Sequence, residues 1–159
     1  MHDAALVVAY LRTTYWVAAR PRPIGLRIGA SEPRLCRLLA RFGSRTWSIV
    51  TAWNPRSRTA PAWRNARYQK ELTSWLRRRR LPWLPAVGEG DDAGWPPEPS
   101  VFVPGMTVPL ARACGRRFRQ NAVVVGGCGG RPRLLWCERV GSGAPRAATE
   151  HSACAIAQS

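Results

Sequence analysis

The stretch T-W-S-I-V-T-A-W-N-P, residues 46–55, decides the fold more than any other part of this chain. Most of it is β-branched or aromatic, which is typical of a buried central strand. The stretch then ends in Asn54 and Pro55, an amide followed by a residue that cannot donate to a β-ladder. An amide at the end of a buried strand is either part of a local turn or a candidate pocket residue.

Outward from this strand, hydrophobic periodicity and turn residues predict alternating helices and strands. Helices are expected at residues 4–11, 31–43, 59–79 and 107–118, and further strands at 15–20, 24–28, 81–87, 101–103, 123–125 and 134–137. This order predicts one α+β domain over residues 1–140, with a mixed β-sheet packed by about three helices. Residues 141–159 are rich in Ala, Ser and Gly without periodicity, so a disordered C-terminal tail is expected there.

The chain is strongly basic, with 25 Lys and Arg against 9 Asp and Glu and a net charge of +16. Arginines are spread along the whole sequence, and a GC-rich genome is the simpler explanation; a selected polyanion-binding surface is the alternative. The densest run, Arg77, Arg78, Arg79 and Arg80, closes a predicted helix, where the helix dipole favours cations. Trp75 and Trp83 flank it, so we identify the run as a candidate nucleic-acid patch.

Cysteine and histidine usage argues against several chemistries. The five cysteines include no C-x-x-C pair, and both histidines lie near the ends of the chain. No zinc site and no Cys–His or Ser–His nucleophile is therefore predicted. Without a secretory start or an apolar run of about 20 residues, a reduced, cytoplasmic protein without membrane contact is expected. Cys128, in G-G-C-G-G, is expected to be a hairpin cysteine without a role.

An acidic segment runs from Glu89 to Glu98. Clustered carboxylates can hold Mg²⁺, but they can equally pair with the chain's own arginines, and the spacing is not that of a calcium loop. We expect ion pairing, with no bound metal and no cofactor. Glu98 stands between Pro97 and Pro99, which restrict its backbone, and is the candidate catalytic residue.

Four amide side chains complete the candidate site: Asn54, Asn65, Gln120 and Asn121. Each has its own structural explanation, as a turn residue, a helix cap or a backbone partner. Together with Glu98 they would line a pocket rich in donors and acceptors, suited to a nucleobase, sugar or amide ligand.

Several segments resemble a known family. They are T-A-W-N-P-R-S (51–57), G-E-G-D-D-A-G-W-P-P-E-P-S (88–100), F-R-Q-N-A-V-V-V-G (118–126) and the opening pairs Ala9-Tyr10 and Thr13-Thr14-Tyr15. These segments resemble the bacterial domain family of unknown function DUF3293, over roughly residues 8–137. The resemblance implies that Asn54, Asn65, Glu98, Gln120 and Asn121 occupy characteristic polar positions of the family. It implies no activity.

The leading prediction from the sequence is a binding module for nucleic acid or a nucleotide-like ligand, acting through arginines and the polar pocket. One alternative is a small enzyme in which Glu98 is a general base or a metal ligand. Another is a protein-interaction adaptor. The oligomeric state is left open.

Overall fold

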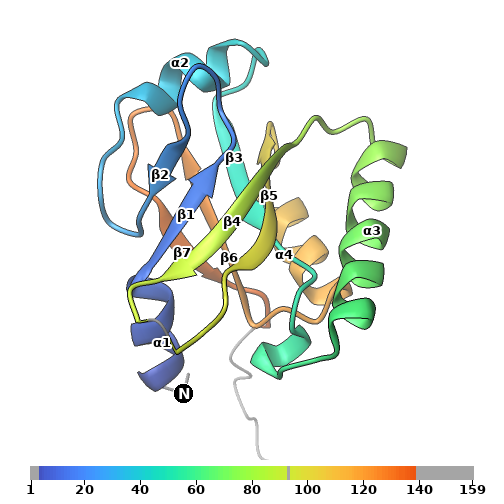
Figure 1. The fold of residues 1–159 in the computed structure, drawn as a ribbon. Helices are drawn as coiled ribbons and strands as arrows, with labels where there is room; N and C mark the ends of the chain where they lie inside the picture. The colour runs from blue at the N-terminus through green and yellow to red at the C-terminus, as the bar shows by residue number, and fades with distance from the viewer. Residues whose placement is uncertain (1–3, 93, 139–159) are drawn as a thin grey trace, which may run out of the picture.

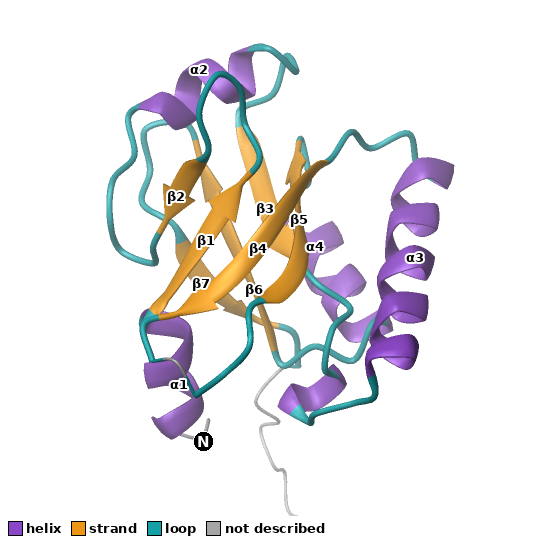
Figure 2. Cartoon of the chain, in the orientation of Figure 1, coloured by secondary structure: helices purple, strands orange, loops and turns teal. Residues whose placement is uncertain are grey.

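The chain is described here by a computed structural model that covers residues 4–92 and 94–138 (Figures 1 and 2). The predicted tail, residues 141–159, lies outside the described residues. The elements are α1 (Ala4–Leu11), β1 (Thr13–Val17), β2 (Ile24–Leu26), α2 (Arg34–Ala40), β3 (Thr46–Val50), the 3-10 turn η1 (Pro55–Ser57), α3 (Ala62–Arg78), β4 (Leu84–Gly90), β5 (Glu98–Pro104), α4 (Val108–Arg117), β6 (Ala122–Gly127) and β7 (Arg133–Trp136). Helices and strands follow the predicted order, and the predicted α+β class is confirmed.

The strands form one seven-stranded sheet in the order β2-β1-β4-β5-β3-β6-β7. Every strand pair in it is antiparallel, so the expectation of a mixed sheet is wrong. The reason lies in the crossovers. α2, α3 and α4 each join two strands that run in the same direction, but at least one other strand lies between the two in the sheet.

The segment from β3 to β6 has the order β-α-β-β-α-β, with spatial order β4-β5-β3-β6. This is the split βαβ arrangement of ferredoxin-like domains, in which each helical crossover skips one strand. The β1–β2 hairpin extends the sheet beyond β4, and β7 extends it beyond β6. The segment around the 46–55 stretch is therefore the core of the fold.

Helices cover the two faces of the sheet differently. α3 and α4 pack on one face, where Leu72, Leu76 and Trp75 are buried together and Trp75 meets Phe118 edge-on. α2 packs on the opposite face through Leu35, Leu38 and Leu39. There Trp47 stacks on Phe102, with ring centroids 5.4 Å apart. The sheet thus has a hydrophobic core on each side.

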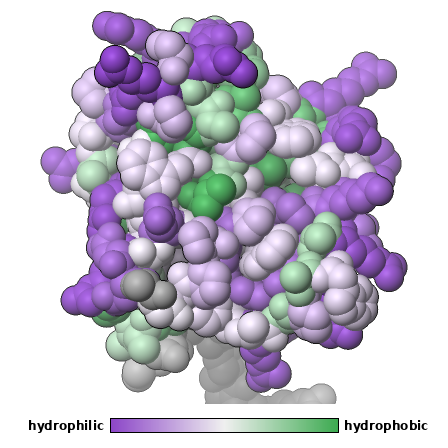
Figure 3. Space-filling view, viewed as in Figure 1, coloured by the Kyte–Doolittle hydropathy of each residue, from purple (hydrophilic) through white to green (hydrophobic). Residues whose placement is uncertain are grey.

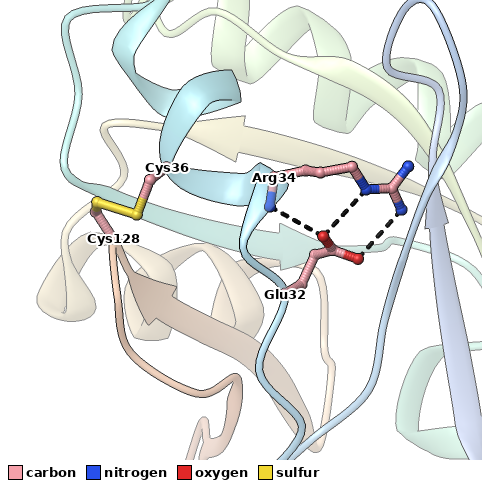
Figure 4. The surroundings of a disulfide bond; sticks show 4 residues. All are labelled: Glu32, Arg34, Cys36 and Cys128. Atoms are coloured by element: carbon pink, nitrogen blue, oxygen red, sulfur yellow. Dashed lines mark hydrogen bonds and ion pairs between the residues drawn. A yellow bond between two sulfur atoms is a disulfide. The ribbon is translucent and has the colours of Figure 1, made fainter.

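The sheet curls so that its two edges approach one another. Gly29 N–H, beyond β2, donates to the Pro132 carbonyl before β7 at 2.8 Å. A disulfide joins Cys36 of α2 to Cys128, just after β6, with Cα atoms 4.8 Å apart (Figure 4). The expectation of a reduced chain, and of a Cys128 without a role, is wrong. A pairing across 92 positions is invisible to spacing rules, which detect only local motifs.

The predicted acidic loop is shorter than expected. β4 continues to Gly90, and β5 already begins at Glu98, because Gly88 pairs with Glu98 on one side and with Tyr15 on the other. Glu89 and Glu98 are therefore strand residues, and only the segment between the strands forms the loop.

Figure 3 shows hydrophilic side chains projecting around the rim of one face, with hydrophobic residues visible near its middle. On β1 and β4, Trp16 and Val87 are among the exposed large hydrophobic residues. Among the described residues, no helix is long and apolar enough to span a bilayer.

Candidate functional site

A cavity of about 690 Å³ lies between α1 and the curled sheet. Four of the residues singled out in the sequence line it together: Asn54, Glu98, Gln120 and Asn121. The fifth, Asn65, does not line it but is buried directly behind Asn54. The structure therefore brings the predicted polar residues to one place, although their role stays a prediction.

The sheet topology explains why these residues converge. β3 lies between β5 and β6 and is antiparallel to both. The end of β3 therefore lies beside the starts of its two neighbours. Asn54 follows β3, Glu98 opens β5, and Asn121 immediately precedes β6. Residues far apart in the sequence meet because strand ends meet.

Asn65 fixes the orientation of the Asn54 amide. The Asn65 Nδ2 donates to Asn54 Oδ1 at 2.8 Å, and the Asn65 Oδ1 accepts the Asn54 backbone N–H at 2.9 Å. Asn54 Oδ1 also accepts the Ala60 N–H at 3.0 Å. With its oxygen held by two donors, the amide must turn its Nδ2 the other way. That Nδ2 donates to Glu98 Oε1 at 2.6 Å.

Glu98 is the partly buried centre of the site. Its Oε1 accepts from both Asn54 Nδ2 and Trp95 Nε1, the latter at 2.9 Å. Burial raises the pKa of the Glu98 carboxyl above its ordinary value, and the two donated hydrogen bonds oppose this in part. Both hydrogen bonds recorded for the carboxylate within the described ranges 4–92 and 94–138 use Oε1. Oε2 is thus the oxygen available to a ligand.

A second polar arm starts at Asn121. Its Nδ2 donates to Ser57 Oγ at 2.9 Å, and Ser57 also hydrogen-bonds to Tyr10 of α1. Burial nevertheless raises the pKa of Tyr10 to about 12. Burial likewise raises the pKa of Tyr15, the next tyrosine along the lining. Both phenols are therefore neutral at physiological pH and can donate hydrogen bonds.

Gln120 braces the loop after β3. Its Nε2 donates to the Trp53 carbonyl at 3.1 Å and to the Phe118 carbonyl at 3.3 Å. The side chain is buried, and its donors are used within the protein. Gln120 thus contributes more to holding the wall of the cavity than to free donor capacity within it.

Left-handed backbone is concentrated in the same loop. Asn54, Arg56 and Ser57 have φ angles of 44°, 58° and 55°. Asparagine tolerates this region, whereas arginine and serine adopt it at some cost, and such residues gather at functional sites. The Arg56 N–H donates to the Arg119 carbonyl at 2.7 Å, which helps to hold the turn.

The candidate nucleic-acid patch is separate from the cavity. Arg77 to Arg80 are exposed at the end of α3, whereas Asn65 lies in its first turn. A 17-residue helix is about 25 Å long. Arg79 lies over the ring of Trp75, 3.8 Å from its centroid. The guanidinium group of Arg79 is therefore exposed and also packs against a side chain of the protein itself.

Two of the four carboxylates of the acidic segment, Asp91 and Asp92, pair with arginines, whereas Glu89 and Glu98 accept hydrogen bonds from neutral donors. Arg27 holds Asp91 through two bonds of 2.7 Å, and Arg12 lies 3.7 Å from Asp92. Within the described part of the chain, no three His, Cys, Asp or Glu side chains gather in a way that could hold a metal ion. Among residues 4–92 and 94–138 the two free cysteines, Cys114 and Cys137, are buried, and burial raises their thiol pKa values to about 12 and about 11.

Sequence reasoning missed several lining residues, namely Tyr10, Tyr15, Ser57 and Trp95. Two of them were visible in the opening pairs of the family resemblance, but nothing local connects them to Glu98. The connection is the β1–β4 pairing, which sets Tyr15 opposite Gly88, next to Glu98 on β5. Trp95 had a signal, since it lies three residues before Glu98 in the same proline-rich loop.

Fold and cavity together define an α+β domain with a ligand-sized pocket at its strand ends. Residues 50–123 match the model of DUF3293, described as a protein of unknown function, which confirms the expected family resemblance over that segment. Neither the curated proteins nor the solved structures include a match to this chain.

Proposed function

We propose that this protein is a binding module whose pocket holds a small ligand through a donor group placed against Glu98. One observation carries the proposal: Asn54, Glu98 and Asn121, from three different strand ends, line one cavity of about 690 Å³. That volume lies within the usual range for small-molecule and cofactor sites.

The hydrogen-bonding groups of Glu98 indicate which chemical group of a ligand the site would bind. Glu98 Oε1 already accepts two hydrogen bonds, so Oε2 receives the ligand. An ionised carboxylate only accepts, which selects N–H or O–H donors. Among the nucleotide-like ligands expected from the sequence, the amino-bearing edge of a base meets this requirement.

The phosphate of such a ligand has weaker support. Arg12 and Arg56, the two arginines in the lining, already lie 3.7 Å and 3.5 Å from the carboxylates of Asp92 and Glu138. Nucleic-acid binding would use Arg77 to Arg80, at the far end of α3. Binding of a small ligand and binding of nucleic acid would therefore use two separate places on the molecule. The pocket has the more extensive set of hydrogen-bonding groups.

The test is calorimetric titration with adenosine, cytidine and guanosine, using wild type, Glu98→Gln and the control Glu89→Gln. Glu89 is a matched control, because its carboxylate also accepts an indole N–H, from Trp16 at 3.0 Å, but it does not line the cavity. Binding weakened at least tenfold by Glu98→Gln alone is expected. Equal binding by both variants would count against the pocket.

General-base catalysis is a second candidate, favoured by the raised pKa of Glu98. A carboxylate in a partly desolvated cavity beside neutral tyrosines can take a proton from a bound hydroxyl or water. The test is to incubate each nucleoside with the wild-type protein and with each variant for hours and to follow its conversion by NMR. Conversion that stops in Glu98→Gln but continues in Glu89→Gln is the expected sign, and a ligand that stays intact in wild type argues for binding alone.

A further inference from the structure

We propose that the group received by Glu98 is a cationic nitrogen: an ammonium, amidinium or guanidinium group seated between the carboxylate and the rings of Tyr10, Tyr15 and Trp95. This inference rests on the proposed binding function, since it names the ligand class of the same pocket. It differs from the nucleobase expectation in the charge that it requires.

The first argument is that, within the described part of this arginine-rich chain, Glu98 has no cationic partner. Of the six other described carboxylates, Glu32, Glu71, Asp91, Asp92 and Glu138 each lie within 4 Å of an arginine nitrogen, and Glu89, which has no such partner, is exposed to solvent, unlike Glu98. Within residues 4–92 and 94–138, no arginine or lysine nitrogen comes that close to Glu98. Neutral donors from Asn54 and Trp95 hold it instead.

A partly buried carboxylate without a counter-charge is costly to keep ionised. A bound cation would remove that cost, whereas a neutral donor would remove only part of it. Of the many arginines in the described ranges, none forms an ion pair with Glu98. The cation of a ligand would therefore take the place beside Glu98 that an arginine takes beside the paired carboxylates.

The second argument is the charge of the cavity wall. Lining residues include the carboxylates of Asp91, Asp92 and Glu98 and the guanidinium groups of Arg12 and Arg56. The lining groups carry one excess negative charge in a protein of net charge +16, and because Asp91 and Asp92 are paired with Arg27 and Arg12, that charge is centred on Glu98. Such a local reversal of sign attracts cations to this site and away from the rest of the surface.

The third argument is the aromatic lining. Trp95 donates its indole N–H to Glu98, which places the indole beside the carboxylate. Burial is the main cause of the raised pKa of Tyr10 and Tyr15, and the negative charge of Glu98 adds to it in both. All three aromatic residues line the cavity, and cages of aromatic side chains are a recurrent way to hold ammonium groups.

The experiment compares benzamidine with benzamide, which have nearly the same shape but differ in charge. Binding to the full chain is measured by titration calorimetry and by the fluorescence of the tryptophans. We expect benzamidine to bind at least tenfold more tightly than benzamide. Glu98→Gln should abolish this preference, Glu89→Gln should keep it, and Tyr10→Phe, which retains the ring, should largely keep it.

Equal affinity for the two probes, or an unchanged preference in Glu98→Gln, overturns the inference. Adenosine is titrated in parallel as a neutral, base-bearing probe. If adenosine binds in a Glu98-dependent way and benzamidine does not, the proposed binding function stands and the cationic ligand is wrong. If neither probe binds to a protein whose circular dichroism and melting are normal, both the inference and the proposed function fail.

Discussion

Asn54 and Glu98, 44 positions apart in the sequence, meet through a 2.6 Å hydrogen bond from the amide Nδ2 to the carboxylate Oε1. The bond joins the loop after β3 to the first residue of β5. Asn65 and Ala60 hold the other side of the amide, so the direction of this bond is set before any ligand arrives. The pocket is preorganised by a chain of side-chain contacts that begins in α3.

Replacing Asn54 with Ala is expected to destabilise the domain by about 1–3 kcal/mol, because buried partners lose their hydrogen bonds. The left-handed φ of 44° at this position adds a further cost for alanine. Urea unfolding of Asn54→Ala and of the control Asn121→Ala checks this. Asn121 has one bond to an exposed partner and should cost clearly less; equal losses would mean that the Asn54 network is not special.

Glu98→Gln should change the pH dependence of stability. The pKa of Glu98 is raised in the folded state, mainly by burial, so the wild type holds that proton more tightly when folded. Its contribution to stability is present below the unfolded pKa and is lost as pH rises through the folded pKa. The free energy of unfolding of the variant should therefore rise relative to that of the wild type between pH 4 and pH 8.

Unfolding of both proteins in denaturant at pH 4, 6 and 8 measures this gap. Gln keeps an oxygen that can accept from Asn54 and Trp95, so the fold should survive the change. A loss of roughly 1–3 kcal/mol at pH 8, the usual cost of leaving buried hydrogen-bonding groups unsatisfied, would assign Glu98 a structural role instead.

Reducing the Cys36–Cys128 disulfide should lower the melting temperature. Its cross-link spans 92 positions, and the chain-entropy model assigns such a loop about 4–5 kcal/mol, of which proteins often realise less. Thermal melting with and without reductant checks this, and the double variant Cys36→Ser/Cys128→Ser should melt low in both conditions. Non-reducing peptide mapping that finds free thiols at both positions would contradict the cross-link.

Polyanion binding, where it occurs, should depend on Arg77 and Arg78 and not on the pocket. Changing both to Gln should weaken binding to single-stranded RNA and flatten its dependence on salt, since fewer counterions are released. Arg79 and Arg80 are left unchanged, because Arg79 packs over Trp75 and Arg80 has a φ of 56°. An unchanged slope of log affinity against log salt would remove this patch from nucleic-acid binding, whereas pocket ligands should bind equally in both proteins.

The sequence predicted the order of elements, and it singled out four polar residues that line the cavity, because both signals are local. Asn54 stands at the end of a β-branched strand, and Glu98 is set between prolines. Sheet pairing is not local: the antiparallel arrangement depends on which strand is inserted between two others. That insertion also determines which residues meet, so it could not be read from residues 46–55 alone.

The same limit explains the residues that were missed. Tyr10 and Tyr15 reach the pocket only through the pairing of β1 with β4. The supporting role of Asn65 depends on how α3 lies against the loop that follows β3. The pairing of Cys36 with Cys128 could not be predicted from a sequence motif, because the two residues are 92 positions apart and meet only in the folded structure.

The disulfide lies outside the segment that matches the family model. Cys36 and Cys128 lie on either side of residues 50–123, the segment that matches the family model, so the bond fastens its two flanks together outside it. It sits where β6 ends, whereas the pocket sits where β6 begins. The cross-link and the cavity therefore lie at opposite ends of one strand, so removing the covalent bond leaves every residue that lines the cavity in place in the sequence.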